Sequence, residues 1–181
     1  GGVGEVDVET LLPHPPRQAA VLDGEARFDA PVQVALGRVQ AMRGNNDLAF
    51  ASFERALRID PNDAESSQAI ARQYEKLGRL KDAEAAYRRA ISLNPDSISI
   101  HDSYGNYLFR QSRHEEAAQQ WQNVIRIAPD HAAALVNLGS ALSETGKIAE
   151  AISMYQRAVE LKPSSMGLSN LGTAYSRANR Y

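Results

Sequence analysis

Residues 80–95 read LKDAEAAYRRAISLNP, and the framework of this stretch recurs every 34 residues along the chain. Each copy ends at a proline, namely Pro61, Pro95, Pro129 or Pro163. Eight positions before each proline stands an aromatic residue, namely Phe53, Tyr87, Trp121 or Tyr155. Residue types that keep the same phase over four copies indicate a repeated structural unit.

Small residues keep the same phase. Alanine stands twelve positions before each proline, at Ala49, Ala83, Ala117 and Ala151. Small residues also stand at Gly37, Ala71, Gly105 and Gly139, and turn residues at Gly44, Gly78, Ser112 and Gly146. Two helices approach most closely where neither carries a bulky side chain. We therefore expect Gly105 to contact Ala117, and the aromatic residue to face the neighbouring hairpin.

Each copy holds two segments with the apolar spacing of a helix. In residues 80–93, Leu80, Ala83 and Tyr87 lie on one apolar stripe. Proline cannot continue a helix, so Asp60-Pro61-Asn62-Asp63 is expected to end one helix and cap the next. The expected helices are 31–43, 47–59, 63–77, 80–93, 97–111, 114–127, 131–145, 148–161 and 166–178.

This pattern resembles the tetratricopeptide repeat family over residues 30–181. The resemblance implies an all-α fold, a right-handed α-solenoid of antiparallel helix hairpins that bury a continuous core by stacking. The expected divisions are a non-repeat segment or linker at 1–29, four full repeats at 30–63, 64–97, 98–131 and 132–164, and a truncated fifth repeat at 165–181.

The two ends depart from the period. Residues 1–16 are proline-punctuated and are interpreted as a linker, while Val21–Phe28 is expected to form a small hairpin around Asp23-Gly24. The fifth copy stops at Tyr181, so its helix is expected to keep an apolar face at Leu168 and Leu171.

The composition excludes several classes of protein. The 181 residues carry a formal net charge of −2 and no cysteine, which excludes a disulfide scaffold, a thiolate metal site and bulk attraction to nucleic acid. No run approaches the ~20 apolar residues of a membrane helix. We therefore expect a soluble protein that neither binds nucleic acid nor inserts into a membrane, with the cytoplasm favoured over the periplasm.

No motif points to catalysis. The histidines at 14, 101, 114 and 131 lack the converging spacing of a zinc site, and we expect them to face solvent or to lie at helix ends. A nucleophile elbow, a phosphate-binding loop and a dinucleotide fingerprint are all missing from the sequence. Glu115-Glu116 stands at a helix start, where it complements the helix dipole. We therefore expect a protein that is not an enzyme and that has no catalytic residue, metal site or cofactor.

The family resemblance places ligands in a concave groove, lined by the first helix of each hairpin. The residues that it implies there are Arg38, Met42, Gln68, Arg72, Lys76, Asp102, Asn106, Phe109, Arg110, Asn137, Ser140, Glu144, Asn170, Thr173 and Arg177.

Two features of these residues bear on the ligand. Asn137 and Asn170 occupy equivalent positions, which is similar to the asparagine ladder of the repeat domain in O-linked N-acetylglucosamine transferases, although Asn-Leu-Gly is also common in repeats of unrelated role. Arg38, Arg72 and Lys76 make one half of the groove basic, which favours an acidic side chain or a C-terminal carboxylate. Chaperone-binding members carry Lys and Asn where this chain has Val34 and Arg38, which argues against chaperone tails as ligands.

The leading interpretation is a protein–protein interaction scaffold that binds an extended peptide or a partner helix in the groove. One alternative is a substrate-recruiting arm of a larger transferase or kinase. Another is a self-assembly module that forms a homo-oligomer through the unfinished C-terminal repeat.

Overall fold

The computed structural model describes residues 18–179, with side chains from Ala30 onward. Every element in this range is a helix: α1 (Gln18–Met42), α2 (Asn46–Ile59), α3 (Ala64–Lys76), α4 (Leu80–Leu93), α5 (Ile98–Arg110), α6 (His114–Ile127), α7 (Ala132–Glu144), α8 (Ile148–Leu161) and α9 (Ser165–Ala178). From α2 to α9, each helix begins and ends within one residue of its predicted bounds.

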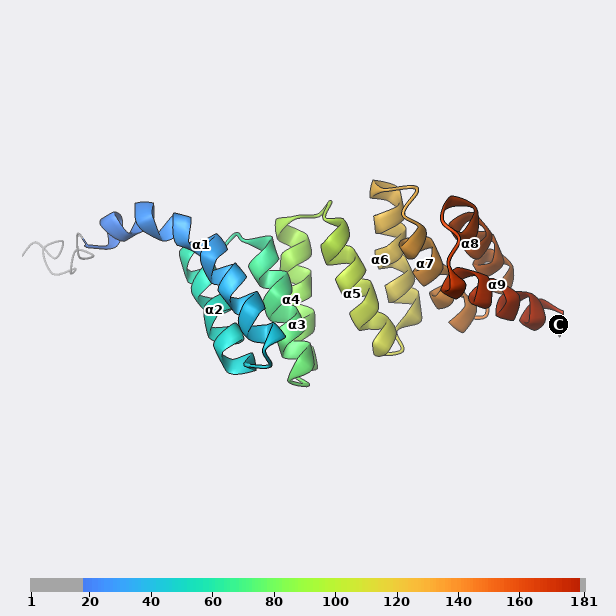
Figure 1. Ribbon diagram of the computed structural model, residues 1–181, viewed down its shortest axis with the longest axis horizontal. Coiled ribbons are helices and arrows are strands. Elements are labelled where there is room, and N and C mark those ends of the chain that lie inside the picture. Colours follow the sequence, from blue (N-terminus) through green and yellow to red (C-terminus); the bar gives the residue numbers. More distant parts are fainter. Residues whose placement is uncertain (1–17, 180–181) are drawn as a thin grey trace, which may run out of the picture.

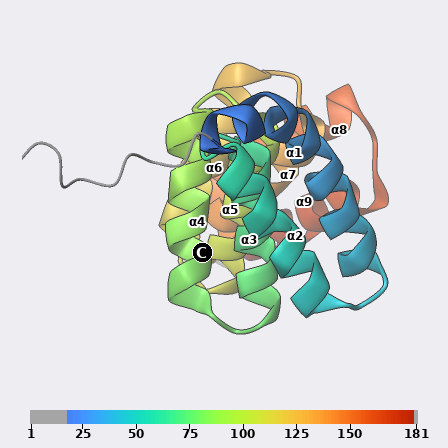
Figure 2. The same ribbon diagram turned by 90° about the vertical axis from the view of Figure 1, so that its left-hand side faces the viewer.

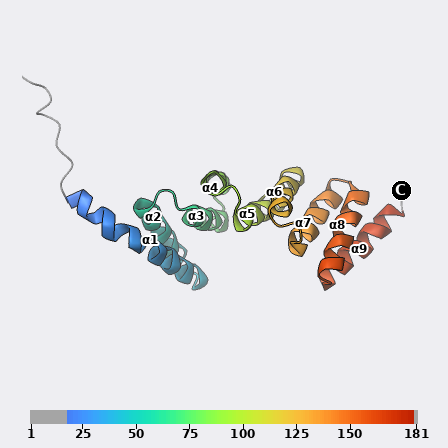
Figure 3. The same cartoon turned by 90° about the horizontal axis from the view of Figure 1, so that it is seen from above.

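The helices form a right-handed α-solenoid, which confirms the predicted fold class. They follow one another along the long axis, with α1 at one end and α9 at the other (Figure 1). Seen along the stack, the hairpins lie one behind another (Figure 2). The helices make two layers, because α4 and α6 lie on one side of the stack and α3 and α5 on the other (Figure 3).

Helix α1 is longer than predicted. It begins at Gln18 rather than at residue 31, so the hairpin predicted at Val21–Phe28 is wrong. Pro31 lies inside this helix, which changes direction along its length (Figure 1). A proline costs one backbone hydrogen bond and bends a helix without always ending it. The linker predicted at 1–16 lies outside the described residues.

Each hairpin closes around an aromatic ring. Phe53, Tyr87, Trp121 and Tyr155 are all buried. A Cβ atom built on Gly105 would lie 2.9 Å from Cε2 of Trp121, and one on Gly139 would lie 2.7 Å from Cε1 of Tyr155. The small residue of the first helix therefore makes room for the ring of its own hairpin, whereas the sequence had suggested an alanine as its contact.

The turns between paired helices need a left-handed backbone. Gly44, Gly78 and Gly146 have φ values of 79°, 71° and 79°, and Ser112 takes the same conformation with φ 58°. Glycine suits this region because it has no Cβ. The prolines follow the second helix of each hairpin. The side chain of Asp63 caps α3 as predicted, and that of Ser97 caps α5 at the equivalent position.

An ion network joins the second hairpin to the third. The Arg113 guanidinium, just before α6, donates to both carboxylate oxygens of Glu84 on α4 at 2.6 and 3.0 Å, and it also donates to Glu116 at 2.6 Å. Arg88 donates to Glu84 at 2.7 Å. The hydrogen bond from Arg113 is the main reason that the pKa of Glu84 falls to about 2.

We expect Gly105→Leu to lower the free energy of unfolding by about 3 kcal/mol, because the added side chain overpacks against Trp121. The matched control is Gly172→Leu on α9, where an added Cβ meets nothing within 4 Å. Thermal unfolding followed by circular dichroism compares the two. Equal melting temperatures for the two variants would contradict this account of the hairpin.

We expect Glu84→Gln to lower stability at pH 7 by about 1–2 kcal/mol, because the charged partner of Arg113 is lost. The pKa of Glu84 is depressed in the folded state from 4.5 to about 2, so its contribution is complete above pH 4.5 and is lost as the pH falls toward 2. The difference between wild type and variant should therefore shrink over that window. Glu160→Gln on α8, an exposed glutamate, is the control and should show no such window.

Candidate binding groove

The first helices of the hairpins carry two series of equivalent positions on one face, and every residue of these series except Met42 is polar. Arg38, Arg72, Asn106, Ser140 and Thr173 make the first series, and Met42, Lys76, Arg110, Glu144 and Arg177 make the second. Every member is exposed or half-exposed. We call the surface that they form the groove face.

Two adjoining hollows lie on this face. One has a volume of about 520 Å³ between α3 and α5, and Arg72, Lys76, Asn106 and Arg110 line it. The other has a volume of about 340 Å³ between α1 and α3, and Arg38 and Met42 line it together with Arg72 and Lys76. The structure thus places these six residues, all of them expected in the groove from the sequence, around one continuous region. Glu144 and Arg177 lie apart from them, in a hollow between α9 and the turn from α7 to α8.

The positive charges on the groove face differ in how they are paired. Arg38 forms an ion pair with Glu65, and Arg110 lies 2.6 Å from Glu75. Arg72 and Lys76 have no carboxylate within 4.0 Å among residues 30–179. Because they lack a carboxylate partner in this part of the chain, the guanidinium of Arg72 and the ammonium of Lys76 favour an anionic ligand. Charge-assisted hydrogen bonds are about twice as strong as neutral ones.

Tyr87 lines the larger hollow and contacts Glu75 there. Its hydroxyl donates to Glu75 at 3.4 Å, and the same carboxylate accepts a hydrogen bond from Arg110 at 2.8 Å. Burial, helped by the negative charge of Glu75, raises the pKa of Tyr87 well above its ordinary value. Tyr87 therefore stays protonated and acts as a donor, which orients Glu75 toward Arg110.

Gln73, beside the smaller hollow, carries a buried acceptor atom that lacks a hydrogen-bond partner among residues 30–179. The residue is only 3% exposed and lines that hollow beside Arg72 and Lys76. Its Oε1 atom is buried and has no hydrogen-bond partner among the described residues. Most buried polar atoms in proteins are satisfied, so this atom is an exception in the core below the hollow.

Gln68 does not belong to the groove face, so the prediction was wrong for this residue. It is 3% exposed, and its amide donates to the carbonyl of Ser99 at 2.8 Å and to the hydroxyl of Ser103 at 2.8 Å. Its repeat position is that of Val34 and Val136, which are also buried. This position joins neighbouring hairpins.

Asp102 and Phe109 serve mainly to build the third hairpin. Asp102 accepts a hydrogen bond from the indole of Trp121 at 3.0 Å. Phe109 is half-buried, with its ring 4.7 Å from the ring of His114 and 5.8 Å from that of Trp121. Both residues were predicted as ligand contacts, but their side chains are engaged within the fold.

The side-chain amides of three predicted groove asparagines donate hydrogen bonds to other side chains of the protein. Asn106 donates to Asp102 at 3.2 Å, Asn137 donates to the same carboxylate at 3.4 Å, and Asn170 donates to Ser140 at 3.4 Å. Among residues 30–179, no hydrogen bond reaches the Oδ1 atoms of these three amides. Their remaining capacity is therefore that of acceptors for N–H groups.

Glu75, Gln73 and Tyr87 were not identified from the sequence as site residues. Ser103, which also lines the larger hollow, could have been found, because it shares the repeat position of Asn137 and Asn170. Glu75 gave no such signal, since its role depends on Arg110, which lies 35 residues away.

The histidines were only partly predicted. His131 caps α7 through its ring, as a helix-end residue. His101 is instead 4% exposed, with Nδ1 2.9 Å from Gln120 and Nε2 2.8 Å from the carbonyl of Pro95. Within residues 30–179, no three His, Asp or Glu side chains converge as metal ligands. In the described part of the chain, no helix is long and apolar enough to cross a membrane.

Comparison with solved structures shows related folds. The pilF protein of Pseudomonas aeruginosa is 25% identical with a TM-score of 0.76, over 88% of this chain and 72% of that one. MamA of Desulfovibrio magneticus RS-1 is 22% identical with a TM-score of 0.75, over 83% and 86%. YrrB, described as a TPR protein with an unusual peptide-binding site, is 17% identical with a TM-score of 0.72, over 91% and 84%.

Family models cover most of the described residues. The model of the middle TPR-like domain of cilia and flagella-associated protein 70 matches residues 67–178, and a tetratricopeptide repeat model matches residues 18–64. No curated protein matches the sequence significantly. The matches agree with the 34-residue period and with the stacked hairpins. The chain belongs to the tetratricopeptide repeat family.

Proposed function

We propose that this protein is an interaction scaffold that holds a peptide segment of a partner protein on the groove face. The observation that carries the proposal is the pair Arg72 and Lys76. Both border the two adjoining hollows, and neither has a carboxylate within 4.0 Å among residues 30–179. The structural likeness to YrrB, which its description calls a TPR protein with a peptide-binding site, supports a peptide as the class of ligand.

The chemistry around this pair favours a peptide carboxylate with an N–H group close by. Arg72 and Lys76 would hold the carboxylate through charge-assisted hydrogen bonds. The Oδ1 atom of Asn106, which accepts no hydrogen bond among residues 30–179, would accept the neighbouring N–H. Met42, which is 88% exposed at the rim of the smaller hollow, supplies apolar surface for an adjacent side chain. The carboxylate belongs to a C-terminal residue, or to an aspartate or glutamate.

Display of a 12-residue peptide library on phage tests the proposal. We expect wild-type protein to enrich peptides with an acidic group, and Arg72→Glu/Lys76→Glu to bind them about 10- to 100-fold more weakly, since a hydrogen bond to a charged group is worth about 1.5–3 kcal/mol. Arg55→Glu/Lys81→Glu is the matched control, because it makes the same charge change at exposed positions of α2 and α4. Each enriched peptide is then tested with a free and with an amidated C-terminus. Loss of binding on amidation would identify the C-terminal carboxylate as the ligand group, and retained binding would identify an acidic side chain. Equal binding by both double variants would refute the groove face as the site.

Exposed apolar residues on α9 favour a second candidate function, self-assembly. Met166, Leu168 and Tyr175 are 65%, 53% and 43% exposed, whereas Leu171 packs partly against the core. We expect light scattering to show association that rises with concentration and is abolished in Leu168→Glu/Tyr175→Glu. Ser169→Glu/Ser176→Glu adds the same charges to polar positions of the same helix and should leave association unchanged. A wild-type protein that stays monomeric at high concentration would remove this candidate.

A further inference from the structure

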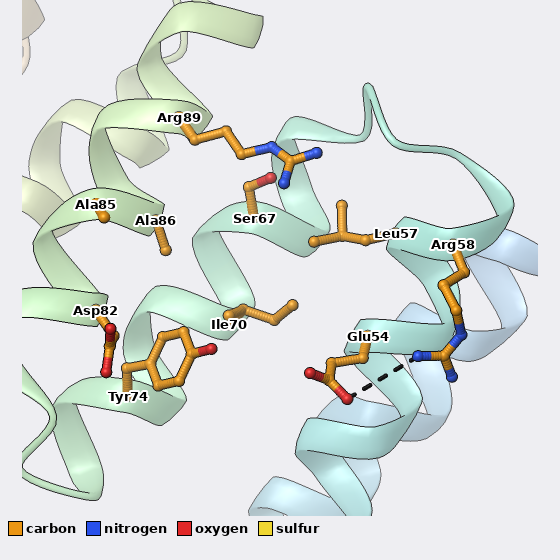
Figure 4. Close-up of a pocket in the computed structure, with 10 residues that line it drawn as sticks. All are labelled: Glu54, Leu57, Arg58, Ser67, Ile70, Tyr74, Asp82, Ala85, Ala86 and Arg89. Atoms are coloured by element: carbon orange, nitrogen blue, oxygen red, sulfur yellow. Dashed lines mark ion pairs between the residues drawn. The ribbon is translucent and has the colours of Figure 1, made fainter.

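A further hollow lies away from the groove face, among α2, α3 and α4, with a volume of about 450 Å³. The side chains of Leu57, Ile70 and Ala86 form its apolar floor, and Tyr74 forms one wall (Figure 4). No residue predicted for the groove lines it. Two of its three helices are second helices of their hairpins, so it opens on a different layer of the solenoid.

The repeat itself explains why this hollow exists. Ser67 and Ala86 border it, and 34 residues later the same positions hold His101 and Gln120, which contact each other at 2.9 Å. A further 34 residues on, these positions hold Leu135, which is fully buried, and Met154, which packs against the core. The later junctions between hairpins are thus filled by large side chains of the chain itself. The first junction has two small residues and stays open.

The wall of the hollow is held in place without a ligand. The Arg79 guanidinium lies 4.5 Å from the centroid of the Tyr74 ring, and the Phe50 ring contacts Tyr74 edge-on at 5.1 Å. A ring that is already fixed loses little freedom when a ligand arrives. The site is therefore preformed for an apolar group.

The rim carries opposite charges at its two ends. Glu54 and Asp82 lie at one end, and Arg89 lies at the other end of α4 (Figure 4). The contacts of these charges are exposed: Glu54 is 4.0 Å from Arg58, Asp82 is 2.8 Å from Arg79, and Arg89 donates to the carbonyl of Pro61 at 2.7 Å. Exposed pairs of this kind contribute little to stability, so a ligand exchanges them at low cost.

We propose that this hollow is a second docking site, which takes one leucine- or methionine-sized side chain of a partner protein. We infer the size of this side chain from the residues that fill the later junctions, namely His101, Gln120, Leu135 and Met154. Charge complementarity determines which residues flank this side chain in the partner: a basic residue toward Glu54 and Asp82, and an acidic residue toward Arg89. The partner supplies here the side chain that fills the junction, whereas the later junctions are filled by side chains of their own repeats.

The test uses a phage-displayed 12-residue library in which a central Leu or Met is flanked by Lys or Arg on one side and Asp or Glu on the other. The blocking variant is Ala86→Met, which copies Met154 of the fourth hairpin and should leave the melting temperature equal or higher. Ala149→Met makes the same change at an exposed position of α8 and serves as the control. We expect peptides enriched on wild type to bind Ala86→Met at least ~10-fold more weakly, which corresponds to about 1.4 kcal/mol. Binding to Ala149→Met should be unchanged.

A second variant keeps the test decisive if Ala86→Met unfolds. Glu54→Lys reverses one rim charge at an exposed site, and it should weaken the enriched peptides while peptides with the opposite charge order bind better. These peptides should bind Arg72→Glu/Lys76→Glu as well as wild type, which separates this site from the groove face. Peptides that bind wild type and Ala86→Met equally would overturn the proposal. So would self-association of wild type that Ala86→Met abolishes, because the occupant would then be a second copy of the chain.

Discussion

The contact on which this structure depends is the packing of one aromatic ring against one small residue inside each hairpin. Trp121 over Gly105 and Tyr155 over Gly139 leave no space for a Cβ atom on the first helix. The ring can lie across that helix only where the side chain is missing or very small, so ring and small residue determine together how closely the two helices approach. The 34-residue period repeats this contact, and every other feature of the solenoid is arranged around it.

The junctions between hairpins are less uniform than the hairpins themselves. The second and third hairpins are joined by the amide of Gln68 and by the pair Glu84 and Arg113, both of them polar. The third and fourth are joined through buried Leu135. The first and second leave a hollow above Ile70. A repeat protein can vary its junctions in this way because each repeat contacts only its neighbours. The same freedom lets a junction become a binding surface.

The groove face and the hollow at the first junction differ in chemistry. The groove face is basic around Arg72 and Lys76, which line both of its adjoining hollows. The hollow at the first junction is apolar at its floor, with charges only at its rim. A scaffold with two unlike surfaces on different layers can hold two segments of one partner, or two partners, without competition between them. In the first case the second segment binds at a raised effective concentration.

The sequence by itself determined the helices, the hairpins and the identity of the buried rings, because these depend on spacing within one repeat. It also placed Arg38, Arg72, Lys76, Asn106 and Arg110 on one face, since residues at equivalent phases share a surface. Only the tertiary structure decided what depends on contact between repeats. Gln68 and His101 are polar, yet they are buried, because partners from other helices satisfy them. Glu75 became part of the groove through Arg110, and the hollow beside Ala86 follows from side chains that are too small to fill a junction. The start of α1 was missed for another reason: Pro31 predicts a boundary from local geometry, and a helix can continue through a proline at the cost of one hydrogen bond.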